Sequence, residues 1–325
     1  MAKVSILLCC YNQKSYLAKA IESALTQTHS DIELVIMDNG STDGSHELLE
    51  TYRSDPRIKL VLHQKNEFMT KTSNEGLRLC TGEFVSQLYG DDYYLPEKIE
   101  KQLQCFQKLP KEVGVVYSPG YRLNVVTGEK WIPPMIQKSG WVLEEMLCSE
   151  NLGGRINPIS PLIRRECFEK YPFREEIFHE SEEIFIRFAI GYQFYYLDEP
   201  LVVMTDHETN LGKAFKYNQV NSHRLSAALM NDPEFPSQMR GVLRAYMART
   251  LFYYAWQGIR VLEDTRWARS CVAKAWMLFT KESFRPKAIV CTLLSLLPSS
   301  LLHGINRIIS SLRGTRQVAL KESLS

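Results

Sequence analysis

The chain lacks both of the glycine patterns that mark common nucleotide-binding loops. No G-x-G triplet occurs among its 325 residues, and no G-x-x-x-x-G-K-[S/T] stretch is present. These absences argue against a dinucleotide-binding fingerprint and a phosphate-binding P-loop, which both bring glycine backbone close to the phosphates. A nucleotide bound by this protein must therefore be held in another way.

Paired cysteines and a leader segment are missing as well. The eight cysteines include no C-x-x-C pair, and none lies in a histidine-rich cluster. This spacing argues against a zinc site or a disulfide framework and favours buried thiols in a reducing compartment. The apolar run from Val4 to Cys10 follows Lys3 directly and is too short for the hydrophobic region of a signal peptide. We therefore expect the body of the protein to be cytoplasmic.

Net charge is low, but it is distributed unevenly. The chain is 45% hydrophobic and 23% charged, which is typical of a globular protein with one large domain and a smaller one. Its net charge is +2, yet residues 265–325 carry ten Lys/Arg against two Asp/Glu, so the first 264 residues have a net charge of −6. A basic tail on an acidic body indicates an anionic partner, for which we expect a membrane surface and not a nucleic acid.

Nearly continuous apolar runs alternate with segments in which apolar residues have helical spacing. The sequence predicts strands over Val4–Cys10, Ile32–Met37, Ile58–Leu62 and Phe84–Leu88, and helices over residues 16–27, 46–52 and 70–79. Such apolar runs suit strands that are buried on both faces of a parallel sheet. The alternation therefore predicts an α/β fold with a doubly wound, mixed but mainly parallel sheet.

Side chains that can bind a ligand or a metal ion follow three of these strands. Tyr11 comes after the first strand, Asp38 after the second, and Asp91 with Asp92 after the fourth. Because the carboxyl ends of parallel strands meet at one edge, we expect these side chains to line one crevice. Tyr11 can stack on a base, Asp38 can accept from a base N–H or a ribose hydroxyl, and a divalent cation can stabilise the acidic pair. Each also has a structural interpretation, as a turn aromatic, a cap or a solvated turn.

Four short motifs follow one another in the first part of the chain. They are Val4-Ser5-Ile6 to Tyr11-Asn12, Asp38-Asn39-Gly40-Ser41-Thr42-Asp43, Asn74-x-Gly76, and Gly82-Glu83-Phe84 to Asp91-Asp92. In order and spacing this set resembles family 2 glycosyltransferases of the GT-A fold, of the type that builds bacterial cell-surface polysaccharides. The resemblance covers about residues 1–215, which we assign to the glycosyltransferase domain, and leaves residues 216–325 as a helical C-terminal region.

The resemblance implies an inverting, metal-dependent glycosyltransferase that moves a sugar from a nucleotide-diphosphate donor to a hydroxyl of a glycan or lipid-linked acceptor. The positions matching donor-binding residues are Tyr11, Asn12, Asp38, Asn39, Ser41, Asn74 and Asp91. A divalent metal, Mn²⁺ or Mg²⁺, would be held by Asp92 and by His207 of a His-x-x-Asn stretch. The alternatives are a degenerate, non-catalytic protein that binds a nucleotide sugar or a partner, and a nucleotidyltransferase, which the missing glycine-rich loop disfavours.

Three positions depart from the family pattern. Asn39 replaces an aspartate of the donor loop, and Tyr89 replaces one carboxylate of the acidic motif, so Asp92 is the predicted metal ligand. Ser181 stands where the family usually has its catalytic aspartate, which leaves Glu182, with Glu180 close behind, as the predicted general base. Acidic residues at a helix start also complement the helix dipole without any catalysis.

The tail contains a long run without charged residues. Nineteen positions, Ala288 to Asn306, carry no Asp, Glu, Lys or Arg, but Pro298, His303 and Gly304 interrupt the run. A transmembrane helix needs about 20 mostly apolar residues, so two short amphipathic helices in the membrane interface fit residues 287–311 better. The alternative is a helical cap or a dimer interface. With membrane contact, the protein would be peripheral on the inner face of the cell membrane.

The two candidate bases can be separated by substitution. Removing a general base that deprotonates a sugar hydroxyl typically lowers turnover about 10²–10⁴-fold. We expect Glu182→Ala to show a loss of this size in nucleotide-sugar turnover and Glu180→Ala to show a smaller one. The reverse order, with only Glu180→Ala abolishing turnover, would move the role to Glu180.

Overall fold

The computed structural model describes residues 2–148, 156–177, 184–298 and 300–307. The chain divides into two compact units. The first comprises Met1–Lys213 with Asp232–Pro236, and the second comprises Ala214–Asn231 with Ser237–Ser325. The predicted boundary lies between residues 215 and 216, and the roles assigned to its two sides stay predictions. Residues 308–311 of the predicted membrane segment lie outside the described residues.

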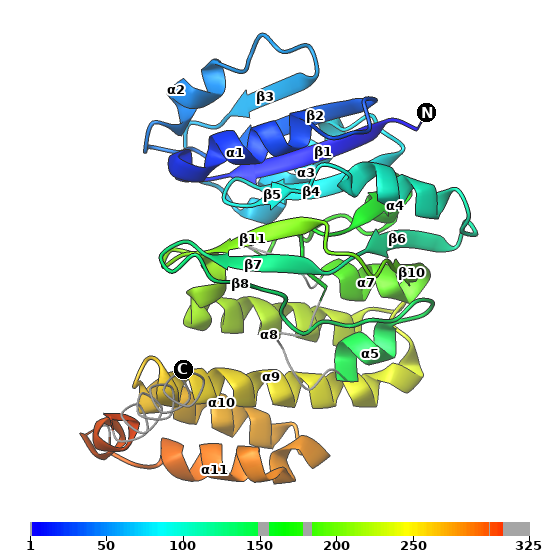
Figure 1. Cartoon of the computed structure of the whole chain (residues 1–325). Helices are drawn as coiled ribbons and strands as arrows, with labels where there is room; N and C mark the ends of the chain where they lie inside the picture. Colours follow the sequence, from blue (N-terminus) through cyan, green and yellow to red (C-terminus); the bar gives the residue numbers. More distant parts are fainter. Residues whose placement is uncertain (1, 149–155, 178–183, 299, 308–325) are drawn as a thin grey trace, which may run out of the picture. The chain divides into compact units, whose positions relative to one another are not determined.

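The first unit is built on a seven-stranded sheet with the order β10-β6-β9-β4-β1-β2-β3. Its strands are β1 (Val4–Cys10), β2 (Ile32–Asp38), β3 (Ile58–Leu62), β4 (Phe84–Tyr89), β6 (Val113–Tyr117), β9 (Leu162–Arg164) and β10 (Gln193–Tyr196). Only β9 runs antiparallel to its neighbours, β4 and β6. This arrangement confirms the predicted mixed, mainly parallel sheet (Figure 1).

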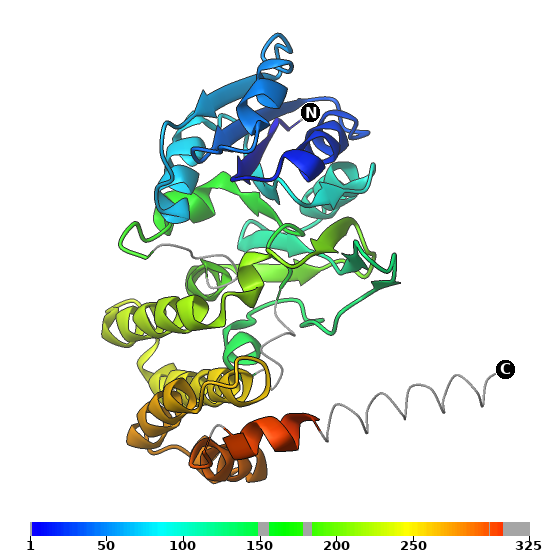
Figure 2. The ribbon, with the colours of Figure 1, turned by 90° about the vertical axis from the view of Figure 1, so that its left-hand side faces the viewer.

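Helices cover both faces of the sheet, as Figure 2 shows. The helices of this unit are α1 (Lys14–Leu25), α2 (Ser45–Glu50), α3 (Met69–Leu79), α4 (Lys98–Phe106), α5 (Leu143–Cys148), α6 (Arg165–Lys170) and α7 (Ile184–Gly191). In α1 the residues spaced for one helix face, Leu17, Ala20, Ile21 and Ala24, are all buried. They join the core with Val4, Ile6 and Leu8, which share one face of β1 because side chains alternate along a strand.

The opposite face of β1 meets α3. At Gly76 of α3, an added Cβ would lie 2.4 Å from the Leu7 side chain and 2.9 Å from the Met37 side chain. The helix therefore approaches the sheet more closely than a side chain would allow. Since α1 and α3 take opposite faces, every residue of β1 and β2 is buried, which explains their continuous apolar runs.

A second sheet of four strands has the order β5-β11-β7-β8. Its strands are β5 (Tyr93–Tyr94), β7 (Gly120–Asn124), β8 (Lys130–Trp131) and β11 (Val202–Asp206). The sequence predicts two strands over residues 192–196 and 201–205, and both form, but in different sheets: β10 pairs with β6, and β11 pairs with β7. The reason is that the connecting chain runs alongside residues 117–120 and bonds to them, through Leu197 N to Tyr117 O and Leu201 N to Pro119 O.

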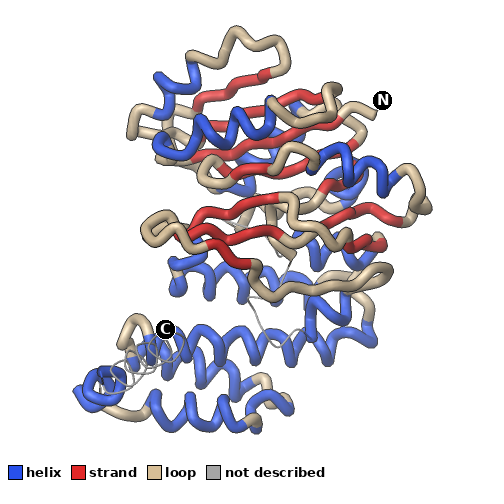
Figure 3. Tube along the Cα trace, viewed as in Figure 1, coloured by secondary structure: helices blue, strands red, loops and turns tan. Residues whose placement is uncertain are grey.

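The second unit is helical over the residues described (Figure 3). It contains α8 (Phe215–Asn231), α9 (Arg240–Arg260), α10 (Thr265–Met277) and α11 (Pro286–Ser295), and residues 300–307 are also helical. The side chain of Asp264 caps α10 by accepting from Trp267 N at 2.9 Å. Within the described part of the chain, no helix combines the length and the apolar character needed to cross a membrane.

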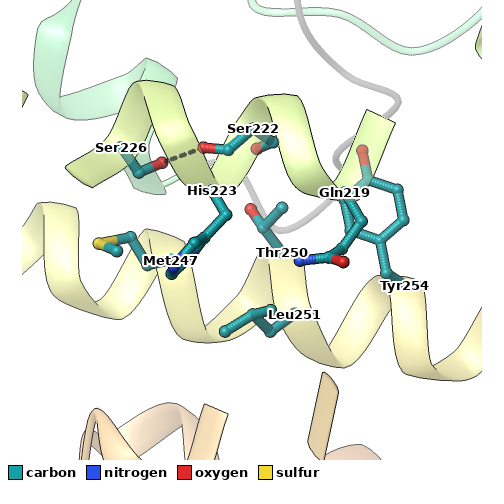
Figure 4. Close-up of a pocket in the computed structure, with 8 residues that line it drawn as sticks. All are labelled: Gln219, Ser222, His223, Ser226, Met247, Thr250, Leu251 and Tyr254. Carbon is teal, nitrogen blue, oxygen red and sulfur yellow. Dashed lines mark hydrogen bonds between the residues drawn. The ribbon is translucent and has the colours of Figure 1, made fainter. Parts of the chain in front are cut away.

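A small cavity lies between α8 and α9 (Figure 4). Its volume is about 10 Å³, and its lining includes Ser222 and Thr250. Their hydroxyl oxygens have no hydrogen-bond partner among the described residues. A volume of this size admits about one water molecule, so the cavity is too small for a substrate and is not a candidate functional site.

Lys98 is fully buried beneath the first sheet. Its Nζ donates to Ser86 Oγ at 2.7 Å and to Gln102 Oε1 at 3.0 Å, and it lies 4.4 Å from the centre of the Tyr94 ring. These partners are neutral, so burial holds the pKa of the Lys98 ammonium well below its usual range. At pH values between the lowered pKa of Lys98 and its ordinary pKa, the folded chain therefore keeps Lys98 uncharged, whereas the unfolded chain binds a proton there.

This difference predicts a pH dependence of stability. Unfolding restores the ordinary lysine pKa of about 10.4, so the unfolded chain takes up a proton, and the free energy of unfolding rises with pH between the lowered pKa of the folded chain and that value. Between about pH 6 and pH 8.5, below the ionisation of ordinary thiols, we expect wild type to gain up to about 1.4 kcal/mol per pH unit relative to Lys98→Met. Urea denaturation of the full chain measures the difference.

Lys108, which is exposed just after α4, provides the matched control. Wild type and Lys108→Met should keep a constant difference in the free energy of unfolding over the same pH range, because Lys108 is in contact with water in the folded chain as it is in the unfolded one. A constant difference between wild type and Lys98→Met would contradict a neutral buried lysine.

Candidate functional site

The carboxyl ends of β1, β2 and β4 lie at one edge of the first sheet. Cys10 of β1 pairs with Asp38 of β2, and Cys9 pairs with Tyr89 of β4. The segments that follow these strands therefore start side by side, which brings Tyr11, the loop after Asp38, and the acidic pair to the same edge. This is the edge at which open α/β sheets bind ligands.

Asp38 organises the loop that follows β2. Its side chain is fully buried, and Oδ1 accepts from Ser41 N at 2.8 Å and from His46 Nε2 at 2.7 Å. Among the residues that the structure describes, Oδ2 accepts only from the Cys10 thiol, at 3.5 Å, so it keeps the greater capacity to accept a further hydrogen bond. No motif in the sequence marks His46, because nothing in the spacing links a residue on α2 to a carboxylate eight positions earlier.

Asn12 joins the turn after β1 to the same loop. Asn12 has a φ of 52°, a left-handed conformation that asparagine tolerates better than most residues. Its N–H donates to Ser41 Oγ at 2.8 Å, and its Oδ1 accepts from Thr42 N at 2.8 Å. The neighbouring Tyr11 is 39% exposed, so its ring is available at the rim of this edge.

Two other predicted donor-site residues bind backbone of the chain itself. Asn39 donates to Glu67 O at 2.9 Å and accepts from Glu67 N at 3.0 Å, which ties the loop after β2 to the segment before α3. Asn74 donates to Phe173 O at 2.8 Å and accepts from Phe173 N at 3.0 Å. Both amides therefore shape the site's surroundings in this structure, and their predicted contact with a donor stays a prediction.

Asp91 meets His207 and Asn210. Its Oδ2 accepts from His207 Nε2 at 3.0 Å and from Asn210 Nδ2 at 3.3 Å. The His207 ring stacks on Tyr16, with centroids 5.0 Å apart and planes 15° apart, which fixes the orientation of the imidazole. The structure thus brings together side chains that are more than 100 residues apart in the sequence. Sequence reasoning missed Tyr16, which carries no motif.

Asp92 has a different environment. Its carboxylate is buried, and Oδ1 accepts from Thr205 N at 3.0 Å. Burial and the adjacent Asp91 charge together hold the pKa of Asp92 well above its usual range. Asp92 and His207 were the predicted metal ligands, yet the carboxylate that contacts His207 is that of Asp91. Among the residues described, no group of three or more His, Cys, Asp or Glu side chains gathers into a metal site.

Gly90 permits the close approach that places Asp91. An added Cβ at Gly90 would lie 2.7 Å from Cys10 Cβ and 2.7 Å from Gln13 Oε1. Its N–H donates to Cys9 O at 3.2 Å, so the end of β4 stays paired with β1 up to this residue. A side chain here must push the acidic pair away from the β1 end.

The candidate bases Glu180 and Glu182 lie outside the described residues. The chain before them is anchored at Thr70, whose Oγ1 donates to Ile177 O at 2.5 Å. The chain after them enters α7, where the buried Arg187 donates to Pro172 O at 2.6 Å. These contacts fix both flanks of the segment to the first unit.

The doubly wound sheet, with a polar loop and an acidic pair at its carboxyl edge, defines a GT-A-type α/β domain. The chain belongs to Glycosyl transferase family 2, whose sequence profile matches residues 5–171. Chondroitin synthase of Escherichia coli is 35% identical over 147 residues, a match that covers 41% of this chain and 21% of that protein. The chain therefore spans only about a fifth of the length of this curated relative.

Solved structures share the fold. TarS of S. aureus, residues 1–349 in complex with UDP-GlcNAc, has a TM-score of 0.65 at 16% identity, over 89% of each chain. The mannosyltransferase PcManGT of Pyrobaculum calidifontis, in complex with GDP-Man and Mn²⁺, has a TM-score of 0.59 at 13% identity, over 94% of this chain and 87% of that one. At these identities the likeness shows the GT-A fold alone.

The close approach at Gly90 can be tested by adding one methyl group. We expect Gly90→Ala to lower the free energy of unfolding by about 1–3 kcal/mol, because the methyl overlaps Cys10 and Gln13 in a packed site. Urea denaturation measures the change. Gly212→Ala serves as the control, since nothing lies within 4 Å of its added Cβ. Equal stability of the two variants would show that an added methyl group fits at the end of β4 without overlap.

Proposed function

We propose that this protein is a glycosyltransferase that moves a sugar from a nucleotide-diphosphate sugar to an acceptor hydroxyl. The observation that carries the proposal is the cluster of Asp91, His207 and Asn210 at the sheet edge that also holds Tyr11 and Asp38. Membership of Glycosyl transferase family 2 supports this function, as do the nucleotide sugars bound by the two fold neighbours.

The donor nucleotide binds at the ends of β1 and β2. The exposed ring of Tyr11 stacks on the base, and Asp38 Oδ2, which accepts only a weak thiol hydrogen bond, accepts from a base N–H or a ribose hydroxyl. The hydrogen bond from Asn12 to Ser41 joins the turn after β1 to the loop after β2, and Asn39 ties the loop after β2 to the segment before α3. The absence of a glycine-rich loop therefore does not prevent nucleotide binding.

The donor's diphosphate lies toward Asp91. A carboxylate and an imidazole are ligands that Mn²⁺ accepts, so Asp91 and His207 fit a divalent metal. Asp92 is buried next to Asp91 and is bonded to the backbone of Thr205. When bound, the metal neutralises charge on the leaving nucleoside diphosphate. Tyr16 keeps the His207 ring turned toward Asp91. This assignment transfers the predicted metal role from Asp92 to Asp91.

A carboxylate before α7 removes the acceptor proton. We assign this role to Glu182, with Glu180 as the second candidate, because they match the family's catalytic segment. The base takes the proton of the acceptor hydroxyl, the hydroxyl oxygen attacks the anomeric carbon, and the bond from that carbon to the diphosphate oxygen breaks. A single displacement of this kind inverts the configuration of the anomeric carbon.

The acceptor is a glycan or a lipid-linked glycan of cell-surface polysaccharide synthesis. The similarity to a chondroitin synthase supports this choice. Peripheral contact of the segment 287–311 with the inner face of the cell membrane would deliver the protein to a lipid-linked acceptor. The alternative of a degenerate binding protein has two observations in its favour, which are Tyr89 in place of a carboxylate and Ser181 in place of the family's catalytic aspartate.

Metal-dependent release of nucleotide tests the proposal. We expect purified protein to release a nucleoside diphosphate from at least one donor of a nucleotide-sugar panel with Mn²⁺ or Mg²⁺, and chelation to stop the release. Asp91→Ala should lower turnover about 10²–10³-fold, a loss typical of removing a group that acts on developing charge. Glu83→Ala, which removes a carboxylate that is 59% exposed at the opposite strand end, is the control.

The comparison of Asp91 with Asp92 assigns the ligand. Asp92→Asn keeps the acceptor oxygen for Thr205, so we expect it to retain more activity than Asp91→Asn does. The opposite order would return the metal role to Asp92. If no donor is turned over, even with a crude lipid acceptor, but a nucleotide sugar still binds, the degenerate binding protein is the better description.

A further inference from the structure

The exposed face of α11 is more apolar than the face it buries. Helix α11 packs against the rest of the helical unit through small residues, Ala288, Cys291 and Ser295. On the outside it presents Ile289, Val290, Leu293 and Leu296, which are 43%, 45%, 60% and 63% exposed. An ordinary surface helix has the reverse arrangement, with its large apolar side chains toward the core. Contact of this face with water is therefore unfavourable.

Aromatic residues extend the exposed apolar surface at the start of α11. Phe284 contacts Trp276 with ring centroids 5.4 Å apart and Phe279 with centroids 5.9 Å apart. Trp276 Nε1 donates to Thr292 Oγ1 at 3.0 Å, which joins this aromatic group to the flank of α11. Met277, Phe279 and Phe284 are 76%, 77% and 56% exposed. Contiguous exposed patches of this kind mark interaction sites on soluble units.

The backbone at Phe279 gives an independent indication. Phe279 has a φ of 44°, the left-handed conformation in which helices commonly end and in which glycine is the favoured residue. A phenylalanine at this position strains the backbone, and its side chain points out from the end of α10 with most of its surface in water. The folded unit therefore gains little burial from this residue in return for its backbone strain.

The exposed charged residues between positions 265 and 307 have one sign. Lys281, Arg285 and Lys287 flank Phe284 along the chain, and all three are exposed. Glu282 is the only acidic residue between positions 265 and 307, and it is 1% exposed because Arg249 and Arg285 bind it at 2.9 Å and 2.8 Å. An apolar surface with a basic rim along the chain matches a partner that is apolar within and anionic at its boundary.

We propose that the exposed face of α11, together with the aromatic group of Trp276, Phe279 and Phe284, docks on the surface of an anionic lipid bilayer. The aliphatic and aromatic side chains enter the boundary between headgroups and acyl chains, and the lysines contact lipid phosphates. Helix α11 has 10 residues, so it lies along the surface and does not cross it. The inference deepens the proposed membrane contact and is independent of the proposed transfer reaction.

A second copy of this chain is a less suitable occupant. A two-fold interface would bring the same patch of each copy together, so the two basic rims would face each other. Like charges across an interface cost affinity, and no exposed carboxylate on residues 265–307 offsets them. The anionic bilayer satisfies both the apolar centre and the basic rim.

Sedimentation of the full-length protein with vesicles tests the proposal. We expect wild type to bind vesicles of phosphatidylcholine with phosphatidylglycerol at least about tenfold more tightly than vesicles of phosphatidylcholine alone, and added salt to reduce the difference. Leu293→Ser with Leu296→Ser should weaken binding to anionic vesicles about tenfold. Lys281→Ala with Lys287→Ala should remove most of the preference for anionic lipid.

Phe279→Gly separates docking from folding. Glycine relieves the left-handed backbone, so we expect an unchanged or raised melting temperature together with weaker vesicle binding. Val126→Ser and Lys108→Ala are matched controls at exposed positions of the first unit, and both should bind vesicles as wild type does.

Three results would overturn the proposal. The first is that wild type stays in the supernatant with both kinds of vesicle. The second is that the control variants lose vesicle binding to the same extent as the α11 variants. The third is a dimer in solution that Leu293→Ser with Leu296→Ser converts to a monomer, without any vesicle binding by wild type. Because no donor sugar is present, each result can be read whether or not the protein transfers a sugar.

Discussion

Two hydrogen bonds from Thr205 hold the candidate site together. Its N–H donates to the carboxylate of Asp92, and its hydroxyl donates to the carbonyl of Asp91, so β11 of the second sheet is attached to the end of β4 in the first. His207 follows two residues later and thereby reaches Asp91. Breaking the attachment would leave a buried carboxylate without its donor, which costs about 1–3 kcal/mol or more. The position of the histidine therefore depends on a residue that need not touch a substrate.

Two buried carboxylates at opposite edges of the first sheet show how partners decide what a carboxylate can do. At the amino edge, burial alone would raise the pKa of Glu33, but hydrogen bonds from Lys3, Ser5 and the Thr81 backbone lower it below its usual range. At the carboxyl edge, Asp92 has one backbone donor and the like charge of Asp91, and its pKa is raised. The first arrangement is complete within the chain and fits a structural role. The second leaves the charged form of Asp92 unfavourable, because one backbone donor does not offset burial and the Asp91 charge.

The unusual features of the two units are of different chemical kinds. In the first unit, polar side chains of the edge loops are buried but bonded to backbone, as Asp38 and Asn39 are, so the loops keep one shape without a ligand. In the helical unit, the unusual feature is apolar surface left in water on α11 and at Phe279. Rigid polar loops suit recognition of a small, highly charged molecule. Exposed aliphatic and aromatic side chains with a basic rim suit a broad surface that has no fixed shape.

The sequence by itself determined the class of fold and the edge at which the site lies, because strands buried on both faces need continuous apolar runs and parallel strands end together. It also singled out Asp91, Asp92 and His207 as candidate site residues, and it predicted the helical nature of the tail. Only the tertiary structure decided that His207 contacts Asp91, that His46 binds Asp38, and that β10 and β11 join different sheets. It alone showed that the apolar face of α11 points outward. These features depend on contacts between distant segments and on which face of an element is covered, and neither local propensity nor spacing along the chain specifies them.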